Sequence, residues 1–189
     1  MLVTGLPDDG AKGVGGITES GINLKVALKL QNLLEQSGTT VILTRSDENG
    51  IWDITKDTIR QKHVSDIRNR VKIGNESSAD IFVSIHLNKI PQEIYSGWQT
   101  FYRKDNEDSI KLAKSIQNSL NNAIQKENER EPAKISGIYI IDHVEIPIVI
   151  VECGFLSNVE EAKKLQEDDY QNRLAWGIYN GIIDYFYDS

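Results

Sequence analysis

The stretch Asp80-Ile-Phe-Val-Ser-Ile-His-Leu-Asn88 combines a short hydrophobic run with polar residues at its carboxyl end. β-Branched and aromatic residues around one small serine are typical of a strand that is buried on both faces. Because side chains alternate along a strand, Ser84, His86 and Asn88 share one side. A core strand that ends in polar groups is typical of an active-site edge in an open α/β sheet. His86 therefore has a position suited to a metal ligand or a general acid or base.

A second hydrophobic run also ends in an ionisable residue. In Ile146-Pro-Ile-Val-Ile-Val-Glu152-Cys-Gly-Phe-Leu-Ser-Asn158, a glycine turn follows Glu152. Packing alone does not require two core strands to end in titratable groups. The adjacent Cys153 is predicted to pack in the core, as free cysteines commonly do.

Glu19 is the third ionisable residue at the end of a predicted element. Thr18-Glu19-Ser20 begins a helix that extends to about Ser37, with Gly38 as its stop. A carboxylate at this position is favoured by the positive end of the helix dipole, but it is also suited to reach a site as a metal ligand. Together, Glu19, His86 and Glu152 have the chemistry of a zinc hydrolase site. His63 and His143 are interpreted as a helix-surface residue and a solvated loop residue.

The remaining pattern alternates strands and helices. It predicts a single-domain α/β sandwich, with a mainly parallel, twisted sheet and helices on both faces. The further strands are expected at 39–44, 97–102 and, as a short one, 138–141, and the further helices at 56–77, 106–126, 158–165 and 170–186.

Composition excludes several classes of protein. A formal net charge of −7 without a basic stripe argues against nucleic acid as the main partner. The single cysteine excludes an internal disulfide, and no apolar run approaches the ~20 residues that cross a bilayer. We expect no signal peptide within the first residues of this sequence, because Gly5-Leu-Pro-Asp-Asp-Gly10 interrupts its start, so that either the chain stays in the cytosol or an export segment is missing from it.

Segments spread over nearly the whole chain together resemble the zinc-dependent N-acetylmuramoyl-L-alanine amidases of type 3. They are Glu19 with Asn23-Leu24, Val41-Ile-Leu-Thr-Arg45, Arg70-Val71 with Asn75, Ala79–Asn88, and Val151-Glu-Cys-Gly-Phe-Leu-Ser-Asn158. Four further segments are most similar to the spore-cortex branch: Asn49-Gly-Ile-Trp-Asp53, Leu87-Asn-Lys-Ile-Pro91, Gly97-Trp-Gln-Thr-Phe-Tyr102 and His143-Val-Glu-Ile-Pro147.

This resemblance implies a peptidoglycan hydrolase that cleaves the amide between N-acetylmuramic acid and the L-alanine of the stem peptide. Glu19 and His86 match two of the three zinc ligands, Glu152 matches the catalytic glutamate, and Asn88 is the candidate for a substrate contact. In the spore-cortex branch, peptide removal prepares muramic acid for conversion to its δ-lactam. The resemblance also implies an extracytoplasmic location, in the cell wall or the spore intermembrane space, and a possible partner lipoprotein.

The start of the chain departs from this family. Its members open with a strand that ends in Asp-x-Gly-His-Gly, and that histidine is the third protein ligand. Here Thr4 stands in place of the histidine and Val3 in place of a glycine. We therefore expect residues 1–189 to be an N-terminally truncated catalytic domain, shortened by a recent truncation or a wrongly assigned start codon, with impaired zinc binding.

Three functions stay open from the sequence. The first is a zinc amidase of the spore-cortex type, active once its third ligand is restored or replaced. The second is a catalytically silent peptidoglycan-binding module. The third is a cytosolic α/β domain that acts on another amide.

Overall fold

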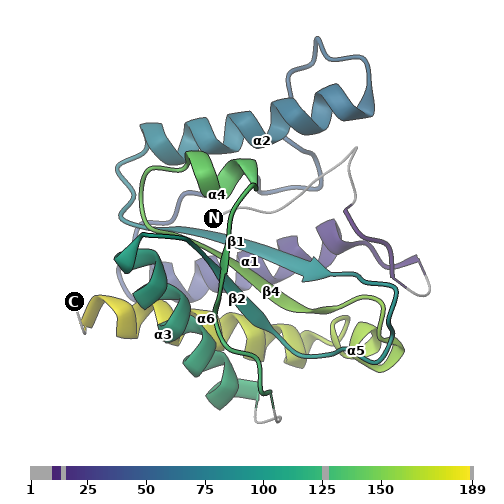
Figure 1. Cartoon of the computed structure of the whole chain (residues 1–189), viewed down its shortest axis with the longest axis vertical. Helices are drawn as coiled ribbons and strands as arrows, with labels where there is room; N and C mark the ends of the chain where they lie inside the picture. The colour runs from purple at the N-terminus through teal and green to yellow at the C-terminus, as the bar shows by residue number, and fades with distance from the viewer. Residues whose placement is uncertain (1–9, 14–15, 125–127, 188–189) are drawn as a thin grey trace.

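The fold is a mixed four-stranded sheet between two layers of helices (Figure 1). The computed structural model describes residues 10–13, 16–124 and 128–187. The strands are β1 (Phe82–Asn88), β2 (Gln99–Arg103), β3 (Ala133–Ile135) and β4 (Ile148–Phe155), in the spatial order β1-β4-β2-β3. β1 pairs with β4 and β2 with β3 in parallel, whereas β2 and β4 are antiparallel. The predicted α/β sandwich with a mainly parallel sheet is confirmed.

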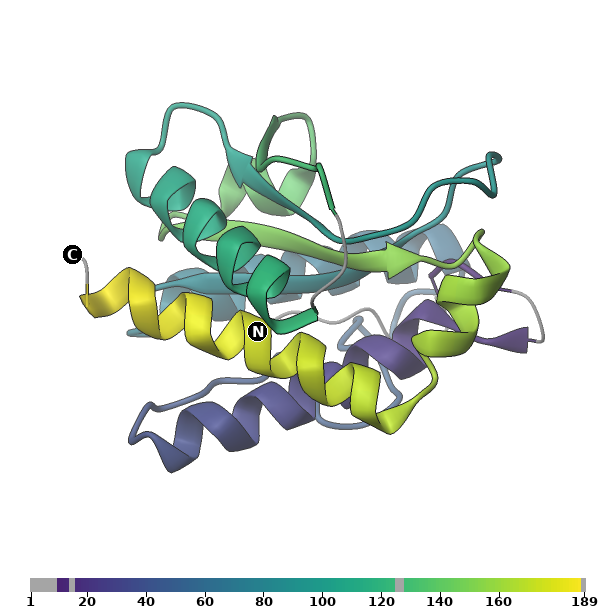
Figure 2. The same ribbon diagram turned by 90° about the horizontal axis from the view of Figure 1, so that it is seen from below.

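Three long helices cover one face of this sheet: α1 (Glu19–Gln36), α3 (Glu107–Ile124) and α6 (Asp168–Tyr187). Figure 2 shows α6 between α3 and α1. Val83, Ile85 and Leu87 of β1 face the core beneath these helices. The helices approach closely because α6 carries small residues: a Cβ on Gly181 would lie 2.4 Å from Ile116 Cα of α3.

The other face is covered by α2 (Ile59–Glu76) and the short α4 (Tyr139–His143), which enclose a second, smaller core. Phe82, Ile148 and Ile150 point into this core. Side chains further along β1 and β4 on this same face lie at the carboxyl ends of the strands.

The remaining helix, α5 (Val159–Lys164), is the next element after β4. None of the helices in the described ranges is both long enough and apolar enough to cross a bilayer.

Two sequence-based predictions of strands are wrong. Residues 39–44 enter no strand ladder, although they are rich in β-branched residues, and β1 pairs only with β4 among the described strands. β-Propensity does not supply the hydrogen-bonded neighbour that a strand requires. Residues 138–141, where a short strand is expected, instead form the N-cap and the first three residues of α4. His143, expected in a loop, is the last residue of that helix. Gly137, at φ 78°, starts this turn, and its N–H donates to the Asp142 carboxylate.

Candidate active site

The carboxyl ends of β1 and β4 bring two of the predicted residues together. His86 pairs in register with Glu152, and Glu152 also pairs with Gln99 of β2. Because paired residues point to the same face, all three side chains lie on the side of the sheet that carries α2 and α4. α4 precedes the start of β4, whereas Glu152 lies in the second half of this strand.

Glu19 reaches this edge from the first turn of α1. Thr18 caps the helix by accepting from Gly21 N, and this places Glu19 at its first position. The carboxylate is buried, and its Oε1 lies 2.9 Å from His86 Nδ1 and accepts from Leu87 N at 3.2 Å. Its Oε2 accepts from Ala11 N at 2.9 Å. Glu19 therefore lies at the positive end of the helix dipole and in contact with His86.

The three groups have different protonation properties. Burial raises the pKa of Glu152 to about 7, with the charge of His86 opposing this rise and that of Glu19 adding to it. Burial disfavours the charged form of His86, but the hydrogen bond to Glu19 and the charge of Glu152 raise its pKa overall. Burial likewise opposes ionisation of Glu19, yet the hydrogen bond with His86 lowers the pKa of this carboxyl. A carboxyl that titrates near neutral pH, as Glu152 does, is suited to general acid–base chemistry.

Glu152 also has an oxygen that the fold leaves unsatisfied. Its Oε2 is buried, and no hydrogen-bond partner for it lies in the part of the chain that the structure describes. Buried polar atoms normally have a partner, so an orphaned carboxylate oxygen beside His86 indicates a place for a reacting group or a water molecule.

The donors fit zinc in kind, but they are too few in number. Carboxylate oxygen and imidazole nitrogen are common zinc ligands, and catalytic zinc normally takes three of them from the protein. Within residues 10–13, 16–124 and 128–187, no group of three His, Cys, Asp or Glu side chains is arranged to hold a metal ion. Thr4, in the place of the family's third ligand, lies outside the described residues.

Of the other residues that the sequence singled out, His63 and His143 lie on helices α2 and α4, whereas Asn88 and Cys153 lie on the strands that carry His86 and Glu152. Asn88 ends β1, and its backbone oxygen accepts from Leu156 N at 2.8 Å; its substrate contact stays a prediction. His63 is exposed on α2. His143 stacks on Tyr139 of the same helix, with ring centroids 3.9 Å apart. Cys153 is fully buried, and this burial raises the pKa of its thiol.

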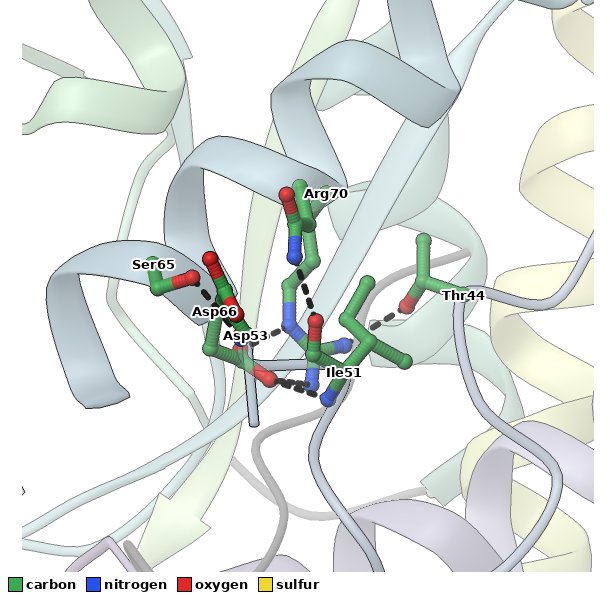
Figure 3. A network of polar contacts seen from close by, with 7 residues as sticks. Thr44, Ile51, Asp53, Ser65, Asp66 and Arg70 are labelled. Carbon is green, nitrogen blue, oxygen red and sulfur yellow. Dashed lines mark hydrogen bonds and ion pairs between the residues drawn. The ribbon is translucent and has the colours of Figure 1, made fainter. Parts of the chain in front are cut away.

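Sequence reasoning missed a polar network that ties the loop 46–58 to α2 (Figure 3). Arg70, which is 1% exposed, binds the Asp66 carboxylate and donates to Thr44 Oγ1 at 2.6 Å. Asp66 also accepts from Ile51 N, and Ser65 Oγ accepts from Asp53 N. The i,i+4 spacing of Asp66 and Arg70 was the available signal, since such a pair shares one helix face. The charge of Arg70 acts on His86, where it opposes the rise in the pKa of the imidazole.

Comparison with known proteins shows similarity over nearly the whole chain. Residues 4–184 match the family described as N-acetylmuramoyl-L-alanine amidase. The chain is 40% identical over 183 residues to the germination-specific N-acetylmuramoyl-L-alanine amidase of Bacillus subtilis, covering 96% of this chain and 76% of the relative.

Solved structures agree with this likeness. The CwlD amidase from Clostridioides difficile, solved in complex with the GerS lipoprotein, is 43% identical and superposes with a TM-score of 0.95, covering 98% of this chain and 95% of that chain. An N-acetylmuramoyl-L-alanine amidase from Clostridium difficile is 29% identical, with a TM-score of 0.84 and coverages of 98% and 92%. The similarity therefore includes the segments that carry Glu19, His86 and Glu152.

Proposed function

Because this chain belongs to the N-acetylmuramoyl-L-alanine amidase family, we propose that it is a zinc-dependent amidase of the spore cortex that uses Glu19, His86 and Glu152. Its substrate is the amide between N-acetylmuramic acid and the L-alanine of the stem peptide. The observation that carries this proposal is the convergence of the three side chains, with Glu19 Oε1 2.9 Å from His86 Nδ1 and Glu152 in register with His86.

Each residue has a distinct role in this proposal. Glu19 Oε1 and His86 Nδ1 would hold the metal, and Leu87 N–H and Ala11 N–H keep the Glu19 carboxylate in place. When bound, zinc polarises the scissile carbonyl and lowers the pKa of the attacking water. Glu152, with its pKa near 7, accepts a proton from that water and returns it to the leaving nitrogen. The orphaned Oε2 is the atom that supports this proton transfer.

We further propose that zinc binding is impaired in this chain. The described residues contribute two converging donors, one fewer than catalytic zinc normally takes from a protein, and no group of three metal-ligating side chains is found among them. This observation favours a second candidate function, a peptidoglycan-binding module that does not turn substrate over.

The cellular setting follows from the relatives. A germination-specific amidase is 40% identical to this chain, and we propose that the product here is cortex muramic acid ready for δ-lactam formation. Such a substrate implies an extracytoplasmic location. The CwlD relative was solved with the GerS lipoprotein, and we propose that this chain also binds a lipoprotein.

Two measurements on the purified chain separate these functions. Zinc content is determined by mass spectrometry, and cortex peptidoglycan is incubated with the zinc-loaded protein and analysed for released stem peptides. We expect peptides that begin with L-alanine, and none from Glu152→Gln, which should keep its zinc. Binding of muropeptides without zinc and without release would support the silent module and contradict the amidase.

A further inference from the structure

The strand that carries Glu152 is interrupted directly after this residue. His86 pairs with Glu152, whereas Asn88 pairs with Phe155, so that three steps along β4 face two steps along β1. This extra residue is a β-bulge, which bends the strand, redirects nearby side chains and takes a backbone group out of the ladder. The direction of the Glu152 side chain therefore depends on what holds the bulge.

The carboxylate of Glu161 binds the backbone on two sides of Glu152. Its Oε2 accepts from Phe155 N and its Oε1 accepts from Gly97 N, both at 2.7 Å. Phe155 is the last residue of β4, and Gly97 precedes Gln99, the β2 partner of Glu152. One side chain thus connects the far side of the bulge to the start of the neighbouring strand.

Several features fix Glu161 itself. It is 3% exposed and lies in α5, where its N–H donates to the Asn158 side chain that caps this helix, at 2.9 Å. A Cβ on Gly154 would lie 3.1 Å from Glu161 Cδ, so the absence of a side chain within the bulge lets the carboxylate approach the backbone. A buried carboxylate is costly unless its oxygens are hydrogen-bonded, and here both oxygens are.

We propose that Glu161 is a positioning residue for Glu152, because its carboxylate holds the bulge and the start of β2 so that the Glu152 side chain stays in the site beside His86. The proposal rests on the proposed amidase function. If Glu161 positions Glu152, its replacement slows turnover in protein that remains folded and zinc-loaded. Replacement of a residue that only stabilises the fold would not have this effect.

The test is Glu161→Gln, measured at a temperature where the zinc-loaded variant is fully folded. Glutamine keeps the shape, but it has a single acceptor oxygen and presents its NH₂ group to the second backbone N–H. Misplacement of a reacting group by about 1 Å can cost roughly 100-fold in rate, so we expect kcat to fall by between about 10-fold and 100-fold, with KM and zinc content close to the parent values. Amide exchange at Gly97 or Phe155 should become faster.

Glu160→Gln is the matched control. Glu160 is the preceding residue of α5, but its exposed carboxylate pairs with Lys163 at 2.9 Å, and it should keep the parent kcat. A Glu161→Gln variant with parental kcat would overturn the positioning role, as would a fall in kcat with proportional loss of zinc. If the parent shows no turnover, the amidase function fails and the role falls with it.

A second variant tests the same contact if Glu161→Gln does not fold. In Gly154→Ala, the new Cβ lies 3.1 Å from Glu161 Cδ and 3.2 Å from Leu165 Cδ1, at a φ of 158° that residues with a side chain rarely adopt. The Glu161 carboxyl group and the backbone of the bulge must therefore both shift. We expect a smaller loss of kcat at unchanged zinc content. A parental kcat in this variant would contradict the proposal.

Discussion

Glu19 Oε1 lies 2.9 Å from His86 Nδ1, although 67 positions separate these residues in the chain. The contact joins the first turn of α1 to the carboxyl end of β1, and Glu152 lies beside it on β4. In water, an ion pair of this kind would contribute little stabilising free energy. Here both groups are at least partly buried, and each favours the charged form of the other: His86 lowers the pKa of Glu19, and Glu19 raises the pKa of His86. The fold thus holds a carboxylate and an imidazole in contact at the carboxyl end of β1.

Removal of the Glu19 charge should weaken zinc binding. In Glu19→Gln the amide oxygen is a poorer ligand than a carboxylate, so we expect the apparent zinc affinity to fall by more than about 10-fold, since loss of a supporting residue alone costs that much. Competition with a fluorescent chelator measures this affinity. Glu35→Gln, at the exposed far end of α1, is the control and should bind as the parent does. Equal affinities in all three proteins would exclude Glu19 as a ligand.

The stability of the metal-free protein should fall as pH rises toward neutrality. The pKa of Glu152 is raised from 4.5 to about 7 in the folded state, so its contribution is fully present below pH 4.5 and is lost as pH rises through 7. Glu152→Gln lacks this loss. The free energy of unfolding of the variant, relative to the parent, should therefore increase by up to about 3 kcal/mol between pH 4.5 and pH 7.5.

Urea unfolding with a chelator present, at several pH values in this range, gives the comparison. The difference between the two proteins, rather than either curve, reports the charge of Glu152 together with its coupling to His86 and Glu19, which titrate in both proteins. A difference that stays constant with pH, or that moves in favour of the parent, would show that Glu152 is not held in a buried position.

Arg70 should be important for stability because it balances a buried charge. Arg70→Met leaves the Asp66 carboxylate without its ion-pair partner and removes the bond to Thr44, so we expect a loss of about 3 kcal/mol in the free energy of unfolding. The urea midpoint measures this loss. Arg68→Met, which changes an exposed residue of the same helix, should have an effect below about 0.5 kcal/mol. Similar midpoints for the two variants would contradict the importance of the network in Figure 3.

Two glycines in helices should respond in opposite ways to alanine. Gly181→Ala places a methyl group 2.4 Å from Ile116 Cα, where the backbone of α3 cannot easily move, so a loss of about 1–3 kcal/mol is expected. At Gly21 the new methyl group meets only the Thr18 side chain, at 3.2 Å, and the higher helix propensity of alanine should stabilise α1 by up to about 1 kcal/mol. Thermal unfolding of both variants measures these changes in stability. A Gly181→Ala variant as stable as the parent would contradict the close packing of α3 on α6.

The sequence allowed the main elements to be predicted from their periodic hydrophobic runs, and Glu19, His86 and Glu152 adjoin such runs. The structure brings Glu19 and His86 into contact, whereas the roles of the three residues, which the family resemblance implied, stay predictions. Residues 39–44 and 138–141 were predicted wrongly for a common reason. Their β-branched composition carries no information about a pairing partner, and Gly137 and Asp142 start a helix through local hydrogen bonds. The β-bulge after Glu152 and the two bonds of Glu161 could not be predicted, because they depend on which residues of β1 and β2 lie opposite β4.

Anomalous diffraction at the zinc edge, from crystals grown with zinc, tests the central claim most directly. We predict a peak about 2.0–2.2 Å from an imidazole nitrogen of His86 and a carboxylate oxygen of Glu19, with Glu152 facing the ion but not bound to it. A zinc peak elsewhere on the protein, or Glu19 and His86 still bonded to each other with no ion between them, would contradict the assignment of these residues as a zinc site.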